Sequence, residues 1–291
     1  MFQNTLCHAG WISIFGFLST SGLPLIYCIY DYLSVDYQHF DVFFMRFICL
    51  TLYCVVVSLF LRCKLKKEDY GVAWRAALLG FVFCTSFYIS IYGTMQWKAF
   101  GIYGMFMALF HYTEYLGIAL SNPKTLTVES FILNHSPHYH IAAVSSWIEF
   151  GIETHYFPEM KEIHLIWILG AVICLGGEIL RKCAMITASH NFTHVVQFER
   201  VQNHRLVKHG VFSYMRHPSY VGWFYWSIGT QIILANPVCF VIYVVASWKF
   251  FHDRIFMEEI TLLNFFGEEY YQYQQNVPTG LPFIKGYKLE L

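Results

Sequence analysis

Long apolar runs constrain this chain more than any other feature, because each is long enough to cross a lipid bilayer. A hydrocarbon core of roughly 30 Å needs about 20 apolar residues in a helix that rises about 1.5 Å per residue. Charged residues make up only 13% of the 291 residues, whereas soluble domains carry about 25%. Runs that qualify lie near 9–30, 40–61, 73–93, 98–120, 138–156, 163–186, 217–235 and 237–258. The sequence therefore predicts an all-α polytopic integral membrane protein that forms a single membrane domain, 1–291. We expect about eight transmembrane helices. The number could be as low as six, because the fifth run is weakened by Glu149 and Glu153.

The basic residues predict which side of the membrane each loop occupies, because cytosolic loops are enriched in Lys and Arg. The 62–75 loop carries Arg62, Lys64, Lys66, Lys67 and Arg75. The loop before it is acidic instead and carries Asp31, Asp36 and Asp41. With 62–75 in the cytosol and eight alternating helices, every basic residue except Arg46, Lys98 and Lys161 falls on or just inside the cytosolic side. Both termini, the polar segment 187–216 and the tail from about 260 are then cytosolic.

Asn236-Pro237 is the only break between the last two apolar runs, so these two helices must pack as a tight antiparallel hairpin. Reflecting the chain about this break places Arg216–Pro218 at the depth of Ile255–Met257. Seven polar residues should therefore converge at the cytosolic boundary beneath the 187–216 loop: Arg216, His217, His252, Asp253, Arg254, Glu258 and Glu259. Interfacial anchoring of Arg and aromatic side chains is the alternative. Anchoring gives no role to the glutamates, although a simple ion pair would explain Arg254 and Glu258, which are four residues apart.

Several other kinds of site are disfavoured by the sequence. The 19 basic and 19 acidic residues balance, whereas a nucleic-acid-binding surface needs a clustered positive surplus. Nine cysteines form no CxxC pair, which favours free thiols over disulfides or zinc. His190 and His194 could share a helix face as metal ligands, but no Cys or carboxylate completes a set nearby, and no metal site is predicted.

Three segments carry a resemblance to a known family. They are RHPSYVGWFYW (216–226), DRIFMEE (253–259) and the tail FGEEYYQYQQNVPTGLPFIKG (266–286), with HRLVKHGV (204–211) before them. Together they resemble isoprenylcysteine carboxyl methyltransferases, endoplasmic-reticulum enzymes that methylate the C-terminal prenylcysteine of CaaX-processed proteins. The resemblance is dense from Arg181 onward. It implies N-terminal transmembrane helices over 1–180 and a C-terminal catalytic region over 181–291.

The resemblance also implies a cofactor and a set of site residues. S-adenosylmethionine would lie under the loop before the seventh helix, against Gln197, His204, Arg205, Leu206, Val207, Phe212, His217, Pro218, Ser219 and Tyr220, with Glu258 closing the site. Arg254 matches the catalytic arginine that faces the substrate carboxylate. The family often has Tyr where this chain has Phe212, which puts a hydrogen bond there in doubt, and Arg205 is expected to contribute backbone. The implied partners are farnesylated or geranylgeranylated C-terminal cysteines and membrane lipid.

The chemistry agrees with this residue set, because a carboxylate is already ionised at about pH 7 and its methylation needs no general base. Alignment and removal of water should supply the rate. Two other functions stay open from the residues alone. One is an NADPH-dependent membrane sterol reductase, which shares RHPxY-like features. The other is a receptor or transporter, whose polar residues should lie near the bilayer midplane.

Some polar residues have no assigned role at this stage. Glu178 and Arg181 form either a local pair near a helix end or part of a site, since a carboxylate within a membrane is by default a candidate site residue. Glu114 is unexplained. The cluster of Tyr270, Tyr271 and Tyr273 is interpreted as interfacial packing.

Overall fold

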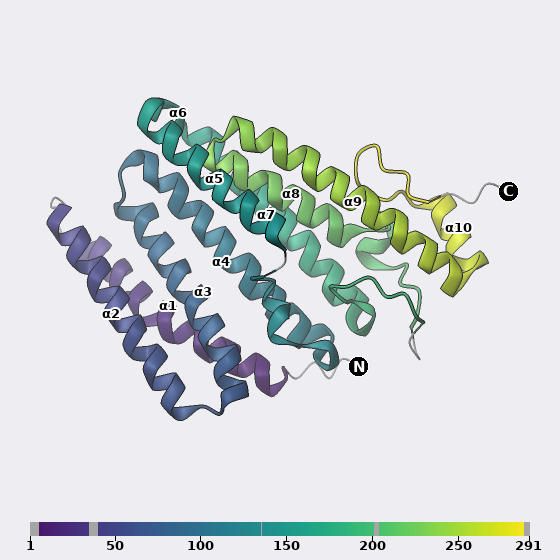
Figure 1. Cartoon of the computed structure of the whole chain (residues 1–291), viewed down its shortest axis with the longest axis horizontal. Helices are drawn as coiled ribbons and strands as arrows, with labels where there is room; N and C mark the ends of the chain where they lie inside the picture. The colour runs from purple at the N-terminus through teal and green to yellow at the C-terminus, as the bar shows by residue number, and fades with distance from the viewer. Residues whose placement is uncertain (1–5, 35–39, 135, 201–203, 288–291) are drawn as a thin grey trace.

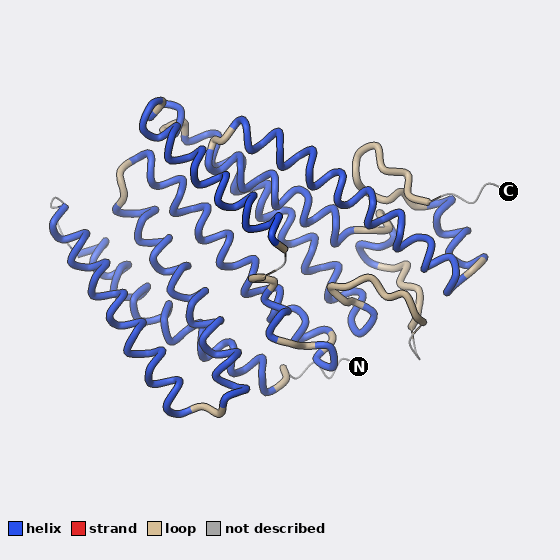
Figure 2. The backbone as a smooth tube through the Cα atoms, viewed as in Figure 1, coloured by secondary structure: helices blue, strands red, loops and turns tan. Residues whose placement is uncertain are grey.

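A computed structural model describes residues 6–34, 40–134, 136–200 and 204–287 of the chain, and within these ranges every regular element is a helix (Figures 1 and 2). The α-helices are α1 His8–Ser34, α2 Phe40–Lys64, α3 Lys67–Tyr92, α4 Met95–Ser121, α5 Pro137–Tyr156, α6 Pro158–Lys161, α7 His164–Ala188, α8 Pro218–Leu234, α9 Pro237–Phe266 and α10 Glu268–Asn276. Short 3₁₀ turns cover η1 Pro123–Thr125, η2 Val128–Phe131, η3 Ser189–Asn191 and η4 Gly210–Ser213. Each of the eight predicted apolar runs coincides with one of the long helices.

The prediction of eight transmembrane helices is only partly tested by this structure. Four described segments are long and apolar enough to cross a membrane, at His8–Ile26, Met45–Lys64, Lys67–Tyr92 and His164–Asn191. The other long helices are shorter or more polar along their length, so the count of eight spans stays a prediction. One predicted boundary is wrong, because α9 continues past position 258 to Phe266. The polar DRIFMEE segment therefore lies about two turns inside the helix rather than at its end.

Connections between helices alternate between two ends of the molecule. Figure 1 shows the α2–α3 connection, the 189–217 loop and α10 toward one end, and the α3–α4 and α8–α9 connections toward the other. Arg62 and Lys64 in the last turn of α2 and Lys67 at the start of α3 lie beside the α2–α3 connection, at the same end as the loop and α10. Asp36 in the preceding acidic loop lies outside the described residues.

Helices α7 and α8 pack with their backbones in close contact along a seam of glycines. A Cβ added to Gly177 would lie 2.5 Å from the carbonyl oxygen of Gly222, and one added to Gly170 would lie 2.5 Å from the backbone nitrogen of Ile233. Because lipid supplies no hydrophobic drive between helices, small residues that allow this approach are what hold such a pair together. This seam fixes the position of α8 and therefore of the segment that begins it.

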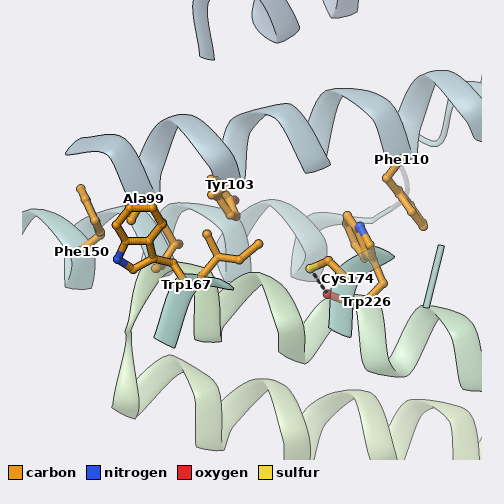
Figure 3. Close-up of a cluster of buried hydrophobic side chains, with 9 residues drawn as sticks. Ala99, Tyr103, Phe110, Phe150, Trp167, Cys174 and Trp226 are labelled. Carbon is orange, nitrogen blue, oxygen red and sulfur yellow. Dashed lines mark hydrogen bonds between the residues drawn. The ribbon is translucent and has the colours of Figure 1, made fainter. Parts of the chain in front are cut away.

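Aromatic side chains fill the centre of the bundle beside this seam (Figure 3). Phe110 of α4 stacks on Trp226 of α8 with ring centroids 3.8 Å apart. The Cys174 thiol donates to the Trp226 carbonyl at 3.3 Å. The eight described cysteines form no disulfide with one another; the side chain of Cys28 lies outside the described residues.

The two glutamates that make the fifth apolar run more polar both contribute to contacts at the α8–α9 turn. Glu149 of α5 accepts hydrogen bonds from the backbone N–H groups of Val238 and Cys239, each at 2.7 Å. It thus satisfies two of the N–H groups that the start of α9 leaves unpaired. Lys161 is fully buried and binds Glu153 at 2.6 Å together with carbonyl oxygens at the end of α8. These contacts hold the two-residue α8–α9 turn in place.

Candidate active site

One open cavity lies between the end of α7, the 191–207 loop, the start of α8, α9 and α10. Its empty space, including the mouth open to solvent, is about 1130 Å³. All twelve residues implied by the family resemblance line it: Gln197, His204, Arg205, Leu206, Val207, Phe212, His217, Pro218, Ser219, Tyr220, Arg254 and Glu258. The fold therefore brings together residues that lie up to 61 positions apart in the sequence.

The hairpin places the start of α8 against α9, close to the predicted depth. The Arg216 guanidinium Nε lies 2.8 Å from Glu259 Oε1, and the His217 Nε2 lies 3.0 Å from the same oxygen. Reflection about Asn236-Pro237 had placed His217 opposite position 256, so the prediction of a tight hairpin is confirmed within three residues. Arg216 and His217 at the start of α8 are thus held by a buried carboxylate of α9.

Three of the seven residues predicted to converge do not line the cavity: His252, Asp253 and Glu259. Glu259 still meets Arg216 and His217 at the start of α8. Asp253 is exposed and pairs with Lys249 on its own helix at 2.7 Å, and His252 contacts Asp253 at 3.1 Å. The reason is helical periodicity. A helix turns about 100° per residue, so 252 and 253 lie on a different face from Arg254 and Glu258.

Glu259 and Arg216 attach the C-terminal tail to the hairpin, and we call this pair the tail latch. Glu259 also accepts hydrogen bonds from the Tyr270 hydroxyl, the Gln274 amide and the Tyr287 backbone N–H, at 3.1, 3.0 and 2.9 Å. Arg216 donates to the main-chain carbonyls of Gln274, Val277 and Lys285. The tail latch therefore holds the C-terminal tail against the hairpin and places α10 at the cavity wall.

Arg254 is held at two points on its guanidinium. Its Nε donates to the Tyr220 hydroxyl at 2.9 Å, and one Nη2 hydrogen is donated to the His194 carbonyl at 2.6 Å. A guanidinium has five N–H groups, and the other three have no partner among the described residues. Glu258, one turn further along α9, makes no ion pair with Arg254 in the described structure, although both line the cavity. The simple ion pair weighed from the sequence is therefore absent.

Two buried polar atoms at the cavity have no hydrogen-bond partner among the residues that the structure describes. They are Oε2 of Glu258 and Nδ1 of His204. The Glu258 oxygen lies 3.7 Å from His217 Nδ1, which is too long for a hydrogen bond. Burial lowers the pKa of His204, and the neighbouring Arg200 and His190 lower it further. The cavity thus offers a carboxylate oxygen and a neutral imidazole nitrogen to a ligand.

Arg181 does not form the local pair with Glu178 that the sequence allowed. Its guanidinium binds Glu114 of α4 through Nε and Nη2, at 2.6 and 2.7 Å. Glu178 pairs instead with Lys182, which lies four residues along the same helix, at 3.2 Å. His194 also contacts Glu114, and because only 189–191 of its segment is helical, it does not share a helix face with His190.

Aromatic residues of the cavity wall were missed by the sequence reasoning. Tyr270 and Tyr273 pack in a hydrophobic cluster with Leu263, as the packing interpretation predicted, and they also line the cavity. The Tyr273 hydroxyl donates to the Phe212 carbonyl at 2.5 Å. Burial raises the pKa of Tyr273 to about 12, which keeps it a donor. Further aromatic wall residues are Trp223, Phe250, Phe251, Phe265 and Phe266, and no spacing signal distinguishes them from lipid-facing aromatics.

The segment that builds most of this cavity matches a known family. Residues 168–264 match the family described as isoprenylcysteine carboxyl methyltransferase. A protein-S-isoprenylcysteine O-methyltransferase of Tribolium castaneum is 48% identical over 98% of this chain and 100% of its own length. The chain belongs to the isoprenylcysteine carboxyl methyltransferase family.

Two further comparisons extend this family assignment to the fold. A human protein-S-isoprenylcysteine O-methyltransferase is 50% identical over 83% of this chain and 85% of its own length. The solved structure of a eukaryotic intramembrane Ras methyltransferase of the family superposes with a TM-score of 0.91 at 48% identity, covering 97% of this chain and 100% of that one. Membership in this family confirms the resemblance inferred from the motifs. It also confirms that the chain is a multi-pass membrane protein with methyltransferase activity. The two alternative functions, a sterol reductase and a receptor or transporter, are therefore excluded.

Proposed function

We propose that the cavity described above is the active site, in which the carboxylate of a C-terminal prenylcysteine is methylated by S-adenosylmethionine. One observation carries this assignment. Arg254 and Glu258 lie one turn apart on α9 and face the same cavity without pairing with each other. A cation with free N–H groups and a carboxylate with a free oxygen suit two ligands of different charge.

The cavity offers hydrogen-bonding groups and aromatic rings that suit S-adenosylmethionine. The unpartnered Glu258 oxygen would accept a hydrogen bond from the amine or a hydroxyl of the cofactor, and the rings of Phe265 and Phe266 line the same space. When bound, the cofactor supplies a methyl group carried on a sulfonium. Gln197, His204 to Val207, Phe212 and His217 to Tyr220 would complete its site.

The chain's own residues orient the nucleophile rather than deprotonate it. Tyr220 and the His194 carbonyl fix the plane of the Arg254 guanidinium. The remaining N–H groups can then bind a carboxylate through two parallel hydrogen bonds. Residues 191–197 and 204–207 line the cavity, and with both ligands bound they would limit the access of water to the carboxylate, which would strengthen this electrostatic contact. Orientation and water exclusion are the contributions the reaction requires.

The aromatic residues that line the cavity suggest where the prenyl chain of the substrate binds. Trp223, Phe250 and Phe251 line the cavity on the α8–α9 side, where the helices are predicted to meet the bilayer. A farnesyl or geranylgeranyl chain would lie against these rings while its cysteine carboxylate reaches Arg254.

The remaining expectations from the sequence belong to the same proposal. Eight helices span the endoplasmic-reticulum membrane, both termini are cytosolic, and 1–291 forms one membrane domain whose 181–291 part is catalytic. The gathering of the loop, the tail and the basic α2–α3 connection toward one end supports this sidedness (Figure 1).

Ligand binding to the purified protein tests the proposal. S-adenosylhomocysteine should raise the thermal midpoint and give a saturable calorimetric signal, whereas NADPH should give neither. Both farnesyl- and geranylgeranyl-cysteine should then accept a methyl group from S-adenosylmethionine. Failure of S-adenosylhomocysteine to bind the folded, purified protein would overturn the assignment of this cofactor.

A further inference from the structure

Glu114 is a buried carboxylate that the mechanism above does not use. It lies on α4, is fully buried, and is not among the residues that line the cavity. Three cationic or polar side chains converge on it: Arg181, Lys182 and His194. A fully buried carboxylate needs an opposite charge and further hydrogen bonds to its oxygens to offset the loss of hydration. The third contact, from His194, comes from the cavity loop rather than from a helix.

His194 connects Glu114 to the proposed substrate arginine. Its ring Nε2 lies 2.8 Å from Glu114 Oε2. Its main-chain carbonyl accepts the hydrogen bond from Arg254 Nη2 at 2.6 Å. One residue therefore joins a buried carboxylate of α4 to a guanidinium of α9 through a loop that belongs to neither helix.

The loop needs such a connection because it has no regular secondary structure of its own. Between η3 and η4 the described residues form no helix or strand, so no helical ladder fixes the direction of the His194 carbonyl. Asn122 holds the loop at its start, through the carbonyls of His190 and Phe192 at 3.1 Å each. The contact between Glu114 and His194 is the next anchor, and it acts on the residue that holds Arg254.

We propose that Glu114 and His194 are positioning residues of the methyl transfer, which orient Arg254 toward the substrate carboxylate by fixing the loop carbonyl. Neither residue donates or accepts a proton in the reaction. This inference rests on the proposed role of Arg254. A purely structural role is the competing interpretation, in which Glu114 only neutralises Arg181.

Kinetics at saturating cofactor separate the two interpretations. His194→Ala should lower kcat for a prenylcysteine about tenfold, the effect of misplacing one charge-assisted hydrogen bond, while the Kd of S-adenosylhomocysteine changes less than about twofold. His194→Gln should recover most of the activity, because its amide can still donate to Glu114. His190→Ala is the matched control from the same motif, since the His190 side chain is exposed and outside the cavity, and it should match the wild type.

A double-mutant cycle with Arg254 tests the connection itself. In an Arg254→Ala background, His194→Ala should reduce kcat less than about twofold further, because the residue it positions is already absent. Glu114→Gln should behave like His194→Ala, with the thermal midpoint reporting folding; if this variant does not fold, the His194 variants still decide. An unchanged kcat in His194→Ala, or an equal loss in both backgrounds, would overturn the inference alone. Full activity of Arg254→Ala would overturn the proposed function together with it.

Discussion

The division of roles between Arg254 and Glu258 can be tested by substituting each in turn. Arg254 is half-buried, and two of its five N–H groups are used to hold it in place. Removing it by Arg254→Ala would take away the contacts left for the carboxylate. A hydrogen bond to a charged group contributes about 1.5–3 kcal/mol, so turnover should fall about tenfold to a hundredfold. Binding of S-adenosylhomocysteine should stay nearly intact.

Arg254→Lys should recover little of this loss. An ammonium keeps the charge, but it lacks the planar fork that meets the Tyr220 hydroxyl, the His194 carbonyl and a carboxylate at once. Recovery of turnover by Lys would show that charge alone is sufficient, and it would refute the orientation argument.

Glu258→Gln should show the opposite pattern. Replacing the charged acceptor by a neutral one should weaken S-adenosylhomocysteine binding about fivefold to tenfold, and turnover at low cofactor concentration should fall in proportion to occupancy. Asp253→Asn is a matched control, because it makes the same change of charge on α9 at an exposed side chain outside the cavity. Calorimetry beside kinetics at saturating cofactor decides. If Arg254→Ala and Glu258→Gln lost cofactor binding equally while folding normally, the two ligand roles would be wrong.

Three further predictions concern packing, protonation and sidedness. Gly177→Ala should lower the thermal midpoint in detergent, since its Cβ would meet the Gly222 backbone at 2.5 Å, a cost of about 1–3 kcal/mol; Gly176→Ala, with nothing within 4 Å, should not. The pKa of His204 is lowered in the folded protein, so below about pH 6.5 the unfolded chain binds a proton more readily than the folded one. Acidification below this pH should therefore destabilise the wild type more than the His204→Gln variant. Equal pH profiles of stability for the two proteins would contradict this. Asn191 of the Asn-Phe-Thr sequon should stay unglycosylated in microsomes, and a mobility shift lost on Asn191→Gln would reverse the proposed sidedness.

The sequence by itself determined the positions of the helices and twelve of the residues that line the cavity. Helix positions could be predicted because hydrophobic length is a local property, and all eight apolar runs became long helices. The hairpin could be predicted because a two-residue connection leaves α8 and α9 no other arrangement. Motif resemblance then supplied twelve of the residues that line the cavity, although it did not supply the aromatic residues of its wall.

Only the tertiary structure decided which polar side chains meet. Arg181 pairs with Glu114 across two helices rather than with Glu178 on its own helix. Glu259 receives the tail in addition to the start of α8. Such pairings depend on the rotation of each helix about its axis and on the neighbour packed across from it. Spacing along one chain fixes which residues share a face, but close packing against a second helix, as at the Gly177–Gly222 contact, fixes what that face touches.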